Sequence, residues 1–212
     1  MHVEVLVEEP SAEAALRNLL PAILSSQASF QIFRHNGKQD LLSRLPSRLR
    51  GYRKFLPRDW RIVVLIDEDR SDCKALKKKL DKIAFDAGLT TKSRARGAAF
   101  QVMNRIAVEE LESWFFGDPT AIMAAFPKIP EKQFRGARYR DVDSIRGGTA
   151  EALEAILQRH RYFPSGMPKI EVARVISRYM EPERNRSRSF QVFRKGILEL
   201  LSLTAANRGE ES

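Results

Sequence analysis

The sequence predicts an α/β fold with a mostly parallel sheet flanked by helices and a C-terminal helical extension. Short apolar runs alternate with helical repeats through the first half of the chain. The aliphatic run at 62–66 is typical of a strand buried on both faces of a parallel sheet. From Thr149 onward only helical spacing recurs. We therefore predict an α/β core at 1–120 and a basic, mainly helical extension packed on that core at 121–212.

The first strand is expected at residues 3–8, where valines alternate with other side chains. Ser11 is expected to cap the next helix, whose apolar residues from Leu16 to Leu24 share one face. A second strand is predicted at 29–34. The elements expected after it are a helix at 41–55 interrupted by Pro46, a central strand at 61–66, a helix at 76–87 ended by Gly88, a strand within 100–108, and helices at 109–116, 150–159, 170–180 and 190–203.

Positive charge is the main compositional feature of the 212-residue chain. It carries 37 Lys and Arg against 27 Asp and Glu, a net charge of +10. Basic residues concentrate at 34–61, 128–146 and 184–195. One such stretch is typically a solvated face, but three together favour a polyanionic partner, DNA or RNA. The candidate contacts are Arg34, Lys38, Arg48, Arg50, Arg53, Lys169, Arg174, Arg186 and Arg188.

Several functional classes are excluded by what the sequence contains. Cys73 is the single cysteine, so it allows neither an internal disulfide nor a cysteine zinc site, and the three histidines are scattered. No apolar run approaches the roughly 20 residues of a membrane span. The first ten residues lack the pattern of a secretory signal. We expect a cytoplasmic protein without a membrane partner.

Carboxylates follow predicted strands at several points. Glu8 and Glu9 follow the first strand, and Asp67 and Asp69 follow the central one. Because the carboxyl ends of parallel strands converge at one edge, these acids are expected to meet. Such oxygen ligands suit Mg²⁺ or Mn²⁺ rather than zinc or copper. Glu112 lies on the same helical face as a neighbouring glutamate three residues earlier.

Acids after strands also serve as helix caps. We assign that role to Glu13 and Asp72, and Glu109 taken alone is interpreted in the same way. Asp67 and Asp69, together with Glu8 or Glu9, are interpreted as a metal site. The choice between the two glutamates stays open at this point.

Two aromatic groups allow alternative interpretations. Residues 114–116, Trp-Phe-Phe, would suit base stacking but are expected to pack in the core. The arginines at 184–188 with Phe190 and Phe193 would suit a grip on a single strand. A basic helix start at the surface is the preferred interpretation.

An acid after the first strand and an Asp-x-Asp after an apolar strand resemble the Toprim fold of topoisomerases, primases and certain nucleases. Further segments extend the likeness: LVEEPSAEAALRNLLP, GKQDLLSRLPSRLRGY, VVLIDEDRSDCKALKKKL, AVEELESWFFGD and SRSFQVF. Through these segments nearly the whole chain resembles a Toprim-like bacterial family, the domain of unknown function 4276. The strand with Asp-x-Asp and the ELESW segment are the more specific of these.

The resemblance implies a magnesium site. Glu8 would be the general acid/base or metal-linked glutamate, Asp67 and Asp69 the metal ligands, and Glu112 an additional acid. Glu9 stands where the Toprim pattern has glycine, so reading Glu9 as the key acid shifts the motif by one. Relatives are thought to act in phage or plasmid defence beside an ATPase, which here would be a separate chain because no Walker-type loop is present.

The preferred hypothesis is a metal-dependent nuclease acting on DNA or RNA, with Glu8, Glu9, Asp67 and Asp69 as the candidate catalytic acids. The alternative is a non-catalytic Toprim-like module that binds nucleic acid or an ATPase partner. A homodimer is a further expectation about partners. A phosphoacceptor domain is disfavoured because residues 101–118 contain no lysine.

Overall fold

The computed structural model describes residues 1–69, 71–95 and 99–209, with side chains up to 202. In this part of the chain four strands form one sheet, in the order β2-β1-β3-β4. Every neighbouring pair is parallel, which confirms the predicted fold class. The strands are β1 (His2–Val7), β2 (Ser29–Arg34), β3 (Trp60–Asp67) and β4 (Val102–Ala107).

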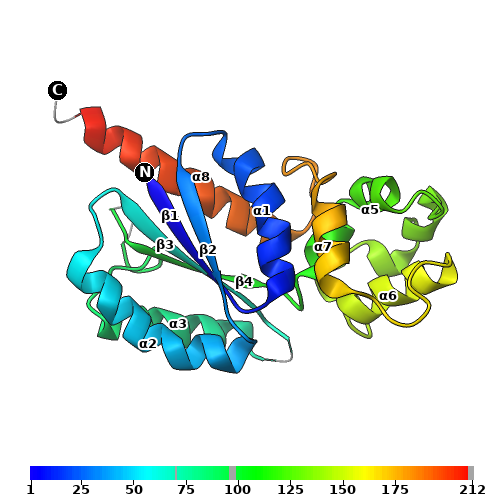
Figure 1. Ribbon diagram of the computed structural model, residues 1–212, viewed down its shortest axis with the longest axis horizontal. Coiled ribbons are helices and arrows are strands. Elements are labelled where there is room, and N and C mark those ends of the chain that lie inside the picture. Colours follow the sequence, from blue (N-terminus) through cyan, green and yellow to red (C-terminus); the bar gives the residue numbers. More distant parts are fainter. Residues whose placement is uncertain (70, 96–98, 210–212) are drawn as a thin grey trace.

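Helices cover both faces of the sheet (Figure 1). One face carries α1 (Pro10–Leu24) and α8 (Arg188–Gly209), and the other carries α2 (Lys38–Phe55) and α3 (Cys73–Asp86). Successive strand residues point to opposite sides, so Val5 joins the core under α1 while Leu6 joins the core under α2. This burial on both faces explains why β1 and β3 are almost wholly apolar.

The connections leave β1 and β3 in opposite directions. From β1 the chain runs through α1 to β2, whereas from β3 it runs through α3 to β4 on the other side of the sheet. Two neighbouring strands whose connections diverge leave a crevice beyond their carboxyl ends, which is the usual ligand position in open parallel sheets. In this protein the crevice lies between the ends of β1 and β3.

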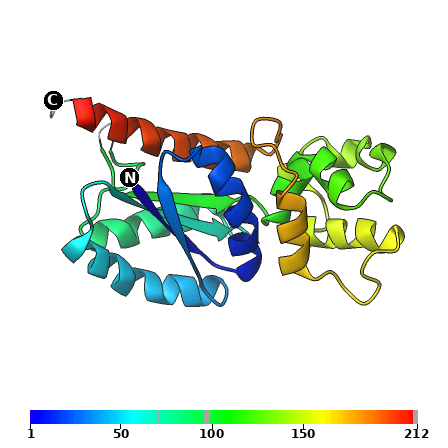
Figure 2. The ribbon, with the colours of Figure 1, turned by 45° about the horizontal axis from the view of Figure 1, so that its top comes forward.

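The second half of the chain is helical, as expected. Its elements are α4 (Glu112–Gly117), α5 (Pro119–Ala125), α6 (Thr149–Arg159) and α7 (Lys169–Ser177), with short 3₁₀ turns η1 (Glu131–Phe134), η2 (Ala137–Tyr139) and η3 (Val142–Ser144). The last helix, α8, returns along the sheet (Figure 2). Gly196 allows this close approach, because a Cβ there would collide with Met103 of β4. The division at residue 120 stays a prediction.

Three local expectations are wrong. Glu9, not Ser11, is the N-cap of α1, because Pro10 already occupies the first helical turn. Pro46 does not interrupt α2, whose apolar face is buried on the sheet and stabilises the helix through that point. Glu109 has a φ of 62°, which is incompatible with a helix, so α4 begins three residues later than expected. No helix of the described residues is long and apolar enough to cross a membrane.

Candidate metal centre

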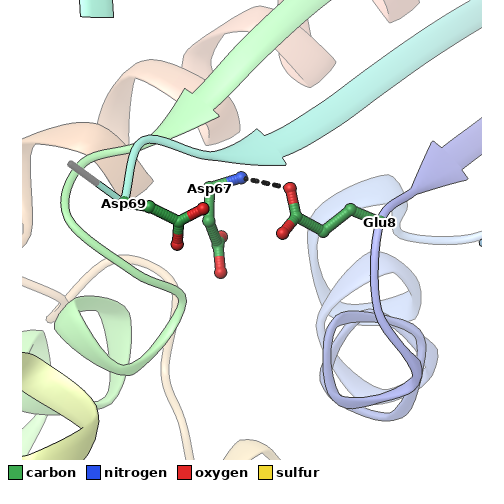
Figure 3. A group of neighbouring side chains, drawn as sticks. All are labelled: Glu8, Asp67 and Asp69. Atoms are coloured by element: carbon green, nitrogen blue, oxygen red, sulfur yellow. Dashed lines mark hydrogen bonds between the residues drawn. The ribbon is translucent and has the colours of Figure 1, made fainter. Parts of the chain in front are cut away.

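Three carboxylates meet at the crevice between β1 and β3. Glu8 directly follows β1, Asp67 is the last residue of β3, and Asp69 lies two residues further on. One carboxylate oxygen from each residue lies within 4.8 Å of the other two. Figure 3 shows the Glu8 and Asp69 side chains approaching Asp67 from opposite sides. The predicted convergence of these acids is therefore present in the fold.

Backbone geometry holds this acid triad, Glu8, Asp67 and Asp69, in place. The backbone N–H of Asp67 donates a hydrogen bond of 3.2 Å to Glu8 Oε2, which links the ends of the two strands (Figure 3). Asp69 has a φ of 50°, a left-handed conformation that aspartate tolerates better than most residues. Its N–H donates to the carbonyl of Glu109 at 2.7 Å. The loop after β3 is thereby tied to the loop after β4.

Burial and like charges dominate the electrostatics of the triad. Burial raises the pKa of Glu8 to about 7, and the charge of Asp69 adds to the shift while the Asp67 N–H opposes it. Burial also raises the pKa of Asp67 well above its ordinary value, with the charges of Glu8 and Glu112 next in importance. A divalent cation would relieve both the desolvation and the repulsion.

Two lysines face these acids. Lys38, at the start of α2, pairs with Asp69 at 2.5 Å and donates to the Glu68 carbonyl at 3.0 Å. Lys169, at the start of α7, is partly desolvated, which lowers its pKa, but the charges of Glu112 and other nearby acids raise the pKa overall. The sequence marked both lysines as candidate phosphate contacts but gave no reason to place them beside the acids.

Glu112 is a fourth acid whose charge acts on the triad. Its side chain is buried at the first turn of α4, and burial raises its pKa to about 7, against the opposing charge of Lys169. It does not belong to the group within 4.8 Å, although its charge acts on Asp67. The role of Glu112 as a further metal ligand stays a prediction.

The structure separates the two glutamates that the sequence left undecided. Glu8 belongs to the triad, whereas Glu9 occupies the N-cap position of α1, where its carboxylate accepts a hydrogen bond from the Ser11 hydroxyl at 3.4 Å but none from the helix backbone. Glu9 acts on the site through its charge, because it raises the pKa values of Glu8, Glu112 and Lys169. A direct role of Glu9 in catalysis stays a prediction.

Three other acids around the crevice, Asp72, Glu109 and Glu110, bind the starts of helices. Asp72 accepts the N–H groups of Lys74 and Ala75 at the start of α3, which confirms its predicted role. Glu109 caps a helix too, but it is α6, where its carboxylate accepts the Thr149 N–H at 3.0 Å. Glu110 binds the same helix start through the Thr149 hydroxyl and the Ala150 N–H. Glu13, expected to be a cap, instead pairs with Arg17 at 2.6 Å.

A cleft of about 700 Å³ opens beside the triad at Asp69. Its walls come from loops far apart in the sequence: Lys38, Asp69, Ser71, Glu109, Glu110, Gly147, Gly148 and Glu151. Gly147 and Gly148 have φ values of 87° and 91°, so the loop preceding α6 can turn tightly at the rim. The cleft gives a ligand access to Asp69 of the triad.

The remaining predicted nucleic-acid contacts are dispersed. Arg34 and Arg174 line a second hollow beside α1. Arg48 stacks on Phe33 with its guanidinium 3.9 Å from the ring centre. The others lie on exposed stretches of α2 or near the start of α8, namely Arg50, Arg53, Arg186 and Arg188. Nucleic-acid binding by these residues stays a prediction.

The aromatic groups are structural. Residues 114–116 are at most 1% exposed, which confirms their predicted place in the core. Phe190 and Phe193 are fully buried against Trp114, so they cannot grip a nucleic-acid strand. Arg184 is also engaged, because it forms an ion pair with the buried Asp118.

Comparison with known proteins gives a family but no activity. A sequence model described as "Domain of unknown function (DUF4276)" matches residues 7–198. No curated protein and no solved structure matches the chain. The resemblance to this family is confirmed, while the wider link to Toprim enzymes stays a prediction.

Proposed function

The chain belongs to the DUF4276 family, and from its acid triad we propose that it is a metal-dependent nuclease that hydrolyses phosphodiester bonds in DNA or RNA. The observation that carries this proposal is the meeting of Glu8, Asp67 and Asp69 within 4.8 Å at the crevice of a parallel sheet. Caps and ion pairs account for many other acids of the chain, whereas the triad places the buried Glu8 and the half-buried Asp67 together beside the exposed Asp69.

The donor set fits Mg²⁺ or Mn²⁺. Carboxylate oxygens are the ligands that these cations prefer. Burial first, and neighbouring negative charges second, raise the pKa values of Glu8 and Asp67, and a bound cation would oppose both effects. Bound there, such a cation would stabilise negative charge on a phosphate and make a water molecule more acidic.

The protein's own groups would position and assist this chemistry. The Asp67 N–H fixes the Glu8 carboxylate against the end of β3. Lys38 and Lys169 place positive charge at two sides of the acids, where they would bind the phosphate and stabilise charge that develops during cleavage. Glu8, with a pKa raised to about 7 in the metal-free protein, is the candidate to exchange a proton with water.

The biological setting is part of the same proposal. The net charge of +10 supports a nucleic-acid substrate. The family resemblance supports action in phage or plasmid defence with a separate ATPase chain. A cytoplasmic location is supported by the single cysteine, which the structure shows as a free thiol.

The direct test is Asp67→Asn, which keeps the shape of the side chain and removes its charge. We expect Mg²⁺-dependent cleavage of DNA or RNA to fall at least about 100-fold, because a main ligand is lost. The matched control is Asp72→Asn in the same loop, whose carboxylate caps α3 and should be dispensable for cleavage. Thermal melts of both variants check that the fold is intact.

Undiminished cleavage by Asp67→Asn would exclude the proposed site. If the wild-type protein binds nucleic acid in EDTA and does not cleave it whichever divalent cation is added, it is a binding module with the same fold.

A further inference from the structure

A second hollow, of about 510 Å³, lies between α1 and α7. These two helices pack side by side at one end of the sheet (Figure 1). The hollow is distinguished by its charge, since four arginines line it against one carboxylate, that of Glu13. We call it the arginine pocket, defined by Arg17, Arg34, Arg174 and Arg178.

The arginines come from three separate elements. Arg17 is on α1, Arg34 ends β2, and Arg174 and Arg178 lie at the end of α7. Glu13 binds Arg17 at 2.6 Å and Arg34 at 3.5 Å. Within the described residues, neither arginine of α7 forms an ion pair.

Arg174 and Arg178 are four residues apart, so two like charges lie on one helical face, which is unfavourable without a counter-charge. The dipole at the end of α7 favours cations there. That dipole does not explain why Arg17 and Arg34 converge on the same hollow from other elements. Glu13 supplies one negative charge to Arg17 and Arg34, so the four arginines keep a net positive charge that a bound anion would neutralise.

The walls of the arginine pocket are held together. The Asn18 amide of α1 donates to the carbonyl of Arg174 at 3.1 Å and to the hydroxyl of Ser177 at 2.9 Å. Apolar groups complete the lining, namely Pro10, Ala14 and Ile170, whose side chain is 43% exposed. Guanidinium groups beside apolar surface suit a ligand with both phosphate and sugar or base.

Two lining residues of the arginine pocket lie close in sequence to residues at the acid triad. Pro10 follows Glu9 at the start of α1, and Ile170 follows Lys169 at the start of α7. Arg34 pairs with Val7 in the sheet register, one residue before Glu8. A strand with its reactive phosphate at the triad can therefore continue along α1 into the arginine pocket.

We propose that the arginine pocket binds a backbone phosphate of the nucleic-acid strand next to the phosphate that is cleaved. This inference rests on the proposed nuclease function, because it takes the same strand as the ligand. It assigns two arginines that the sequence did not single out, Arg17 and Arg178, and it excludes a role in this contact for the distant arginines of α2.

The experiment measures binding separately from cleavage. A fluorescent single-stranded oligonucleotide is titrated with the full-length protein in EDTA, at several salt concentrations. For the double variant Arg174→Ala/Arg178→Ala we expect affinity to fall about tenfold or more. The slope of log affinity against log salt should fall in magnitude by about 0.7, because one phosphate contact to a single strand is lost. Both side chains are exposed, so the fold should survive, and a thermal melt verifies this.

The matched control is Lys74→Ala/Lys78→Ala. These exposed lysines have the same spacing on α3, across the sheet from α1, and the variant loses the same total charge. We expect a much smaller change in affinity and slope. Equal losses in the two variants would overturn the proposal, because they would show a general effect of net charge.

A second measurement distinguishes binding of a nucleic-acid strand from binding of free phosphate. Inorganic phosphate is titrated with wild-type protein and with Arg178→Gln, followed by ³¹P NMR. Phosphate binding that depends on Arg178, together with unchanged oligonucleotide affinity in the double variant, would overturn the strand proposal. Because all binding is measured without metal, these outcomes are independent of whether Asp67→Asn abolishes cleavage.

Discussion

Two carboxylates of this protein, Asp118 and Asp67, show how differently a protein can surround an acid. Asp118 has no solvent exposure and accepts hydrogen bonds from the N–H groups of Ala121 and Glu181. The Arg184 guanidinium binds both of its oxygens at 2.9 Å. Within the described residues Asp67 forms no such ion pair: burial raises its pKa most, and the charges of Glu8, Glu112 and Asp69 raise it further.

The difference separates stability from function. Asp118 joins the start of α5 to the segment preceding α8, and its donors neutralise it, so it contributes to the fold. The same pair raises the pKa of Arg184. The acid triad is internally repulsive, so it is expected to destabilise the metal-free protein and to need a cation.

The largest expected effect is a loss of stability when Asp118 is replaced. Replacing Asp118 by Ala leaves Arg184 without its main partner and the Glu181 N–H without its acceptor, whereas the Ala121 N–H keeps the carbonyl of residue 118. We expect a loss of about 3–5 kcal/mol in the free energy of unfolding, measured by urea denaturation. Glu181→Ala, which removes the exposed partner of Arg184 at 2.8 Å, should cost no more than about 1 kcal/mol. Similar small losses in both variants would contradict the structural role of Asp118.

The second effect concerns pH. In the metal-free protein the pKa of Glu8 is raised from 4.5 to about 7, so between these values the folded state binds a proton that the unfolded state has released. The contribution of Glu8 to stability is therefore fully present below pH 4.5 and is lost as the pH rises through 7. One pKa unit corresponds to about 1.4 kcal/mol, so the loss from Glu8 alone is on the order of 3 kcal/mol.

Urea denaturation in EDTA at pH 5 and pH 8 checks this expectation. The neutral variant Glu8→Gln should be less sensitive to pH than the wild type over this range. Added Mg²⁺ should restore stability at pH 8 by favouring the charged triad. If the wild type is as stable at pH 8 as at pH 5 in EDTA, the acid triad does not destabilise the metal-free protein.

The smallest expected effect comes from a cap in the same loop as the triad. Asp72→Ala removes the acceptor for the Lys74 and Ala75 N–H groups and should cost about 1 kcal/mol of stability. The Mg²⁺-dependent rise in melting temperature should be unchanged, whereas Asp67→Asn should lose it. An equal loss of the Mg²⁺ response in both variants would mean that the loop, rather than the triad, controls it.

Local patterns predicted much of the sheet. Residues 29–34 form the expected strand, because a short stretch between turn residues is a local sequence pattern that indicates extended backbone. The continuous run at 62–66 also identified an internal strand, since burial on both faces imposes an apolar sequence. The helix interruption predicted at Pro46 is wrong, because packing of α2 on the sheet outweighs the local destabilisation by proline.

The sequence by itself determined which acids follow strands, because strand ends and carboxylates are both visible in local order. It did not decide whether Glu8 or Glu9 belongs to the metal site. The tertiary structure decides this, because Glu8 lies in the triad and accepts the Asp67 N–H. The partners Asp118 and Arg184 are 66 residues apart, and Arg17 and Arg178 are further apart still. No local pattern encodes such contacts, because they depend on how the helices pack around the sheet, and that packing decides which charges are neutralised and which are left for a ligand.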